Sequence, residues 1–170
     1  MPDHPAPTDF GLLLGVAAKT YSDRLTAALR DGGFGDLRAP DGTVIRLLRH
    51  HGGLAGTELA ALLGVTKQAA SQLAAGLEDR GYVQQDRAGP DRRVRRLVLS
   101  DRGRAAHDLV VRLGEQLAEE VAGVHGPEGL DRLRRGLATL VERNAPTAEP
   151  VTAAAAALLR PPAGPRPAEG

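Results

Sequence analysis

The chain has 170 residues, which is enough for one domain with a buried core but short for two large independent domains. Aromatic residues make up only 2% of it and tryptophan is absent, so the core must be built from leucine, valine and alanine, a composition that favours packed helices. The net charge of +1 does not by itself point to a nucleic acid partner, and the absence of cysteine excludes disulfides, thiolate metal sites and thiol switches.

The N-terminal stretch is proline-rich and acidic, unlike the basic and then apolar start of a signal peptide. No apolar run in the sequence approaches the ~18 residues that span a bilayer. We therefore expect a cytoplasmic protein without a membrane segment.

Four helices are predicted in the first half of the chain: Phe10 to Arg30, Pro40 to Gly52, Thr57 to Gly64 and Thr66 to Gly81. Proline suits the first turn of a helix, threonine can cap the start, and the glycines mark the ends. The apolar residues recur at helical spacing in each. In the last three helices the residues predicted to face inward are Val44, Leu47, Leu48, Leu59, Ala60, Leu62, Leu63, Ala70, Leu73, Ala74 and Leu77.

Two short strands, Tyr82 to Asp86 and Arg95 to Leu99, are predicted next, and the turn residues between them indicate a β-hairpin. The tip of this hairpin is basic. Its charged residues are Arg87, Asp91, Arg92, Arg93, Arg95 and Arg96. A basic loop can reach phosphates, and an arginine can enter a narrow minor groove. A solvated run of charges is the alternative.

Two further helices are predicted after Ser100, which can cap the first of them, and Gly126-Pro127 separates the two. Each carries its apolar residues on one face. These residues are Leu109, Leu113, Leu117 and Val121 in one helix, and Leu130, Leu133, Leu137, Leu140 and Val141 in the other. Beyond Asn144 the sequence is rich in alanine and proline, so a disordered tail is expected over residues 146–170.

The stretch from Thr57 to Leu77 has the pattern of a helix-turn-helix. Ala60 is small enough for two helices to cross, Gly64 tolerates the left-handed geometry of the turn, and apolar residues join the helices. Ala70 departs from the pattern, because a bulkier β-branched residue would pack better there. A helical hairpin with a glycine turn is the alternative for the motif alone. With the basic hairpin that follows, a winged helix-turn-helix is predicted over residues 39–100.

The chain resembles the MarR family of bacterial regulators from about Phe10 to Arg143. The resemblance is carried by Thr57 to Leu77, Arg80-Gly81-Tyr82-Val83, Asp91-Arg92-Arg93, Leu97-Val98-Leu99-Ser100 and Gly103. It implies that Asp91 and Arg93 form the Asp-x-Arg signature of the wing, in which the acid holds the arginine and the arginine enters the minor groove. Gln72 stands where the family often has a basic residue.

The N-terminal part of the predicted recognition helix carries the polar residues that could contact DNA, because this end enters the major groove. Gln68 and Gln72 can pair with adenine, and Lys67 can reach guanine or a phosphate. Thr66 is a cap that can also touch phosphate, and Ser71 suits either task. A purely solvent-facing role is the alternative for each. The predicted DNA-binding residues are Thr66, Lys67, Gln68, Ser71, Gln72, Arg87, Asp91, Arg92, Arg93 and Arg95.

The terminal helices offer more apolar surface than a small winged-helix core can cover, which predicts a homodimer. A dimer would read two half-sites ~10 base pairs apart on a pseudo-palindromic operator. The alternative is that these helices fold back on their own chain. The expected organisation is a dimerisation helix and connector over 9–38, the winged helix over 39–100, and C-terminal dimerisation helices over 101–145.

The sequence thus predicts a mainly α fold with a small β-hairpin wing and the function of a DNA-binding transcriptional regulator. No nucleophile elbow, phosphate loop or general acid/base pair indicates an enzyme, and the scattered histidines form no convincing metal set. No cofactor is expected. The resemblance implies repression relieved by a small organic effector, expected between the terminal helices and the winged helix, against residues 44–51 and the start of the fifth helix.

The runner-up is a winged-helix module that binds an acidic protein partner and no DNA. Some methyltransferases begin with a winged-helix dimerisation domain, but their catalytic Rossmann portion is missing from this sequence.

Overall fold

The computed structural model describes residues 9–86 and 95–144. Its elements in chain order are α1 (Phe10–Asp31), α2 (Ala39–His51), β1 (Leu54–Ala55), α3 (Gly56–Leu63), α4 (Lys67–Asp79), β2 (Val83–Asp86), β3 (Arg96–Leu99) and α5 (Asp101–Asn144). The predicted mainly α fold with a small β wing is therefore confirmed. The predicted wing tip between β2 and β3 and the predicted tail lie outside the described residues.

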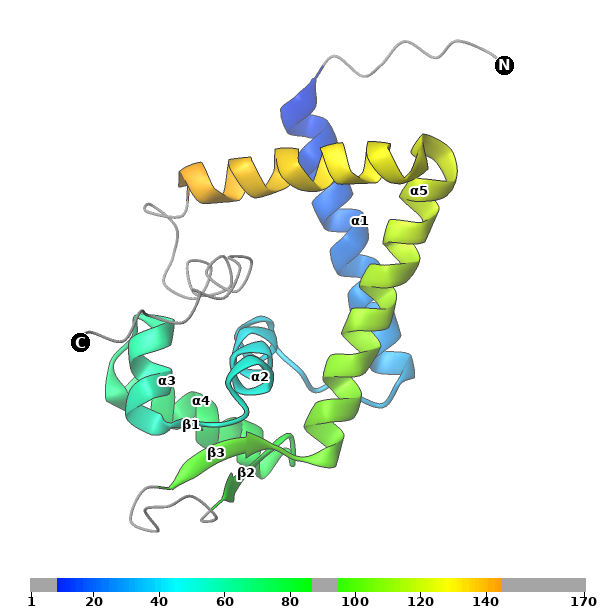
Figure 1. Ribbon diagram of the computed structural model, residues 1–170. Helices are drawn as coiled ribbons and strands as arrows, with labels where there is room; N and C mark the ends of the chain where they lie inside the picture. Colours follow the sequence, from blue (N-terminus) through cyan, green and yellow to red (C-terminus); the bar gives the residue numbers. More distant parts are fainter. Residues whose placement is uncertain (1–8, 87–94, 145–170) are drawn as a thin grey trace, which may run out of the picture.

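Two long helices, α1 and α5, lie at one side of the winged-helix elements, and α1 runs along the first part of α5 (Figure 1). Asp9 caps α1 by accepting a hydrogen bond from the backbone N–H of Leu12 at 2.9 Å. Farther along, the guanidinium of Arg24 donates to both carboxylate oxygens of Glu120, at 2.7 and 2.9 Å. This forked ion pair joins α1 to α5.

The long α5 is divided by a kink, as the sequence predicted. Gly126 has φ 72° and ψ 168°, which is not helical, and Pro127 follows it. Glycine adopts such a positive φ readily, and proline supplies no N–H to continue the hydrogen-bond ladder. We call residues 101–125 the first arm and residues 127–144 the second arm; Figure 1 shows the sharp change of direction between them.

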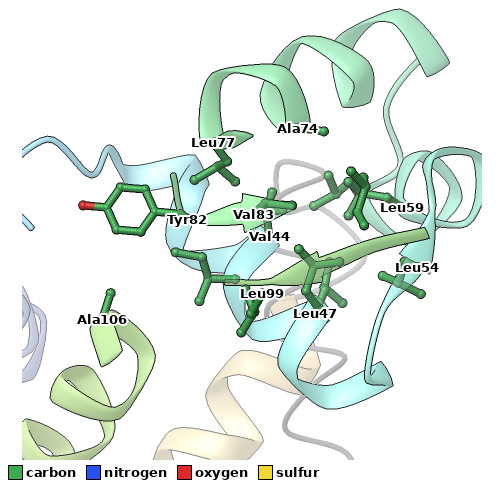
Figure 2. Packing of buried hydrophobic residues seen from close by; sticks show 14 residues of the cluster. Val44, Leu47, Leu54, Leu59, Ala74, Leu77, Tyr82, Val83, Leu99 and Ala106 are labelled. Carbon is green, nitrogen blue, oxygen red and sulfur yellow. The ribbon is translucent and has the colours of Figure 1, made fainter. Parts of the chain in front are cut away.

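The core lies where α2, α3, α4 and the strands meet, and α5 adds Ala106 to it (Figure 2). Tyr82 is fully buried together with Leu48, Leu59, Leu63, Leu77 and Val44. Leu62 was predicted to face this core, but 39% of it is exposed. At 100° per residue, Leu62 lies about 60° outside the sector of α3 that Leu59, Ala60 and Leu63 bury, so α3 has room for three inward residues.

The sheet is antiparallel with the order β1-β3-β2. Val83 pairs with Leu99 and Leu54 pairs with Leu97, so β3 is the central strand. Strand β1 was not predicted, because two residues are too few to show an alternating pattern. β2 and β3 each begin one residue later than expected.

Three threonine or serine caps were predicted, and two of them are present. Thr66 accepts from the N–H of Ala69 at 3.2 Å, and Ser100 Oγ accepts from the N–H of Gly103 at 3.1 Å. Thr57 does not begin α3. The helix starts at Gly56 instead, and the Glu58 carboxylate accepts from the N–H of Ala55 at 2.7 Å. The acid three residues beyond the cap position thus supplies the hydrogen bond.

Gly103 marks a close approach between α5 and the wing. A Cβ at this position would lie 2.1 Å from the carbonyl oxygen of Tyr82, which also accepts from the N–H of Ser100 at 3.0 Å. We expect Gly103→Ala to lower the free energy of unfolding by about 1–3 kcal/mol, because a backbone atom must move to relieve the clash. Urea unfolding measures this change in the free energy of unfolding.

The matched control is Gly42→Ala in α2, where an added Cβ meets nothing within 4 Å. Helix propensity alone should then raise stability by up to about 1 kcal/mol. Equal stability of the two variants would show that the contact at Gly103 relaxes without cost.

Candidate nucleic-acid interface

Helices α3 and α4 form the predicted helix-turn-helix. Gly64 ends α3 in the left-handed region, with φ 66° and ψ 28°, and the N–H of Val65 donates to the carbonyl of Ala60 at 3.1 Å. Ala60 is buried at the crossing. Ala70 is also buried, with 1% exposed, so the small side chain predicted to be a poor fit is enclosed by its neighbours.

The polar face of α4 is open to solvent. Thr66, Lys67, Gln68, Ser71 and Gln72 are all exposed and lie in the first two turns of the helix or at its cap. The structure therefore brings the five predicted residues of this helix onto one accessible end. Their contacts with DNA stay a prediction.

The base of the wing lies beside the same helix. Arg95 is exposed, and its Nη1 donates to Gln85 Oε1 at 3.3 Å. Gln85 Nε2 in turn donates to Glu78 Oε2 on α4 at 3.1 Å. Between α4 and the strands lies a hollow of about 520 Å³ whose lining includes Lys67, Ser71 and Arg95.

The other wing residues divide into two groups. Arg87, Asp91, Arg92 and Arg93 lie outside the described residues. Arg96 was counted among the basic residues of the hairpin, but it is half-buried and its Nη2 donates to the carbonyl of Gly53 at 2.5 Å. It therefore holds β3 to the turn before β1.

A polar network at the C-terminal end of α4 was not predicted. Arg80 donates through Nε to the carbonyl of Gly76 at 2.7 Å, and through Nη1 to the carbonyl of Asp36 at 2.7 Å and to Asp41 Oδ2 at 2.8 Å. Asp41 is buried, and its Oδ2 also accepts from the N–H of Arg38 at 2.7 Å. Arg80 thus connects α4 to the segment that leads into α2.

The same segment is bound from α5. Tyr82 donates its hydroxyl hydrogen to Asp36 Oδ1 at 2.5 Å, and Arg102 Nη2 donates to Asp36 Oδ1 and to the Tyr82 oxygen, both at 3.1 Å. The guanidinium of Arg102 lies 4.7 Å from the centre of the Tyr82 ring. Figure 2 shows the hydroxyl pointing out of the apolar cluster.

These contacts shift the pKa values of the groups involved. The hydrogen bond from Tyr82 lowers the pKa of the Asp36 carboxyl below its ordinary value, and Arg102 acts in the same direction. Burial raises the pKa of the Tyr82 phenol, and the hydrogen bond to Asp36 adds to this. The negative carboxylate and the neutral phenol are therefore the favoured forms.

A cavity of about 320 Å³ lies between α1, α2 and α5. Its walls are largely aliphatic, with Arg38, Arg46 and His107 among the lining residues. The predicted effector site was to lie against residues 44–51 of α2. The cavity meets this stretch at Ile45 and Arg46 and reaches the first part of α5, and it also extends to residues before the stretch, namely Leu37, Arg38, Gly42 and Thr43. That an effector binds there stays a prediction.

Part of the apolar surface of the terminal helices is uncovered. Phe10, Leu13 and Val16 of α1 and Leu133, Leu137 and Leu140 of the second arm are exposed, Phe10 by 65%. Leu113 was predicted to belong to this surface, but it is 7% exposed because the first arm packs against α1. Part of the apolar surface of the terminal helices therefore packs within the chain, and the rest is exposed.

Residues 36–94, which run from the network at Asp36 into the wing, match the model of the MarR family. The match covers α2 to β2 and is a resemblance of this segment to the family. None of the curated proteins matches the chain in sequence. Over the residues that the structure describes, no helix has the length and apolar character needed to cross a membrane.

Solved structures have a similar fold. YusO from Bacillus subtilis is 21% identical, with a TM-score of 0.60 over 79% of this chain and 94% of that one. FabT from Streptococcus pneumoniae, solved in complex with DNA, is 22% identical, with a TM-score of 0.64 over 82% and 100%. MepR from S. aureus, solved with ethidium bromide, is 15% identical, with a TM-score of 0.64 over 79% and 96%. At these identities the likeness is one of fold.

The lowered pKa of Asp36 predicts that the free energy of unfolding depends on pH. A carboxyl whose folded pKa is depressed contributes its full stabilisation above its unfolded pKa of about 3.9, and this contribution is lost as the pH falls from there through the lower folded pKa. Asp36→Asn should therefore be less stable than the wild type at pH 7, and the difference should shrink below about pH 4.

Thermal unfolding across pH 3–8 measures this difference. Because the Asp36 side chain is 41% exposed, the effect is screened by water and should weaken in high salt. The control is Asp79→Asn, which changes an exposed aspartate on α4. A stability difference for Asp36→Asn that stays constant down to pH 3 would contradict the role given to its charge.

Proposed function

We propose that this chain is a sequence-specific DNA-binding regulator of transcription that binds a pseudo-palindromic operator as a homodimer. The observation that carries the proposal is the exposed polar end of α4 beside the basic strand of the wing, within a MarR-family winged helix. FabT and MepR, which share the fold, have both been solved in complex with DNA, and this supports the proposal.

In the proposed complex, the N-terminal end of α4 enters the major groove. Gln68 and Gln72 read adenine through paired hydrogen bonds, and Lys67 contacts guanine or a phosphate. Thr66 and Ser71 hold the helix against the backbone. The exposure of all five side chains is compatible with these roles.

The wing would bind the backbone and the minor groove next to this contact. Arg95 and the tip residues Arg87, Arg92 and Arg93 supply positive charge, and Asp91 orients Arg93, as the family resemblance implies. The hydrogen bonds from Arg95 through Gln85 to Glu78 connect the base of the wing to α4. Wing and recognition helix would then approach DNA together.

We further propose that the protein is a repressor released by a small organic effector in the cavity between α1, α2 and α5. No acidic residue stands among the described residues that line it, whereas Arg38 and Arg46 do, so an organic anion with an apolar body fits its chemistry. MepR has been solved with ethidium bromide, which shows that a protein of this fold can hold an organic molecule.

An effector acts only if it prefers the conformation that does not fit DNA, and a ~100-fold preference supplies about 2.7 kcal/mol. Release of a preformed DNA complex by aromatic acids and phenols, with peroxide and zinc chelators as controls, tests this mechanism. Release by peroxide or chelator alone would refute it.

The alternative function is a protein-interaction module in which the arginines meet an acidic partner. A gel shift with duplex DNA over a range of salt concentrations separates the two, because phosphate contacts release counterions and give a steep salt dependence. Selection of bound sites from random duplexes then supplies the operator. Absence of any duplex binding at low salt would leave the interaction module as the function.

Gln72→Ala should change which bases the protein prefers, because an exposed glutamine on α4 reads a base edge in the proposed complex. We expect a loss of about 1–3 kcal/mol for the affected base pair with non-specific binding nearly intact. The measurement is affinity for the selected duplex and its single-base variants. Gln116→Ala, an exposed glutamine on α5, is the control. Identical base preferences in Gln72→Ala and the wild type would remove Gln72 from the readers.

The homodimer is predicted to form through the uncovered apolar residues of α1 and the second arm. Leu137→Asp should therefore dissociate it, because two charges would be buried at one interface. Leu62→Asp on α3 is a matched control, since both leucines are 39% exposed. Light scattering should give a monomer for Leu137→Asp and a dimer for Leu62→Asp. A wild-type monomer would overturn the prediction.

A further inference from the structure

Residues 36–41, which we call the coupling segment, face two functional parts of the molecule. On one side, Leu37 and Arg38 line the cavity between α1, α2 and α5. On the other side, the Asp36 carbonyl and the Asp41 carboxylate accept hydrogen bonds from Arg80. The segment is therefore at once a wall of the cavity and the anchor of the recognition helix.

Arg80 sits at the end of α4 and cannot move independently of it. Its Nε donates to the carbonyl of Gly76 within the same helix, while its Nη1 donates to the coupling segment. The Arg80 side chain is 22% exposed and that of Asp41 only 3%, so water competes little for this bridge. A shift of the segment is accordingly transmitted to the last turn of α4.

We propose that the coupling segment and Arg80 link the cavity to the recognition helix, so that filling the cavity shifts α4 through the Arg80–Asp41 bridge. The inference rests on the proposed function for its meaning, since α4 is there the DNA-reading helix. Arg80 is in this view a positioning residue: it contacts neither DNA nor ligand, and it sets the orientation of the helix that carries Gln68 and Gln72.

The remaining walls of the cavity explain why the coupling segment is the part that transmits. Ser22, Thr26 and Val110 belong to α1 and α5, which are joined by the ion pair between Arg24 and Glu120. On the winged-helix side, the coupling segment lines the cavity next to Gly42, Thr43, Ile45 and Arg46 of α2. The coupling segment is the part of that side to which Arg80 donates hydrogen bonds. Arg102 also binds it from α5, through Asp36, so the segment is the junction between the terminal helices and α4.

The experiment fills the cavity without a ligand. Thr26 lines the cavity from α1, is exposed, and donates its hydroxyl hydrogen to the carbonyl of Ser22 in its own helix. Thr26→Phe adds a ring at the α1 wall of the cavity, and Thr26→Val is the control of unchanged size. Amide hydrogen exchange of the full-length chain, read by mass spectrometry over residues 77–82, reports on the last turn of α4.

We expect Thr26→Phe to change exchange over residues 77–82 by about fivefold or more, and Thr26→Val to leave it unchanged. In the Arg80→Lys background, which keeps the charge but loses the planar fork, the same substitution should change exchange far less. An equal change in both backgrounds, or no change in either, overturns the proposal. If Arg80→Lys does not fold, as judged by thermal unfolding, Asp41→Asn takes its place.

Because exchange is measured without DNA, the outcome does not depend on the proposed function. A chain that binds no duplex can still show the coupling, and a chain that binds its operator can still lack it. The gel shift tests whether the chain binds duplex DNA, and hydrogen exchange in the two backgrounds tests whether the cavity is coupled to α4.

Discussion

The burial of Tyr82 between α4, the wing and α5 is the constraint on which the rest of the structure depends. Its ring is fully enclosed in the core, its N–H donates to the carbonyl of Leu77, and its own carbonyl accepts from Ser100. Its hydroxyl leaves the core on the side of Asp36. One residue therefore fixes the end of α4, the start of β2 and the start of α5. A buried hydroxyl without a hydrogen-bond partner would cost free energy. Asp36 and Arg102 supply that partner.

Local features of the fold could be predicted from the sequence because they arise between residues close in the chain. The caps at Thr66 and Ser100, the turn at Gly64 and the break at Gly126 each depend on a few adjacent side chains, and all are present. The solvent-facing end of α4 followed from the same helical period. Its exposure is a property of one helix, whereas its contacts with DNA are not, and they stay predictions.

The features that were missed depend on residues far apart in the sequence. Asp41 and Arg80 are 39 positions apart, and Asp36 and Arg102 are 66 apart, so no local period relates them. In the sequence alone, nothing distinguishes these four charged residues from other surface charges. Strand β1 was missed because its two residues pair only with a strand more than 40 positions later. The inward placement of Leu62 was wrong because periodicity gives the angle of a residue but not the width of the surface that faces it.

The kink at Gly126 has a consequence for how two copies would lie on DNA. The first arm of α5 begins at Asp101, directly after β3 of the wing, and the second arm carries Leu133, Leu137 and Leu140. The kinked helix α5 thus connects the wing to the surface that we propose as the dimer interface. In such a homodimer the bend of that helix would determine how far apart the two wings stand. The backbone conformation of Gly126 would then influence the distance between the two half-sites, whereas α4 would determine which bases are read.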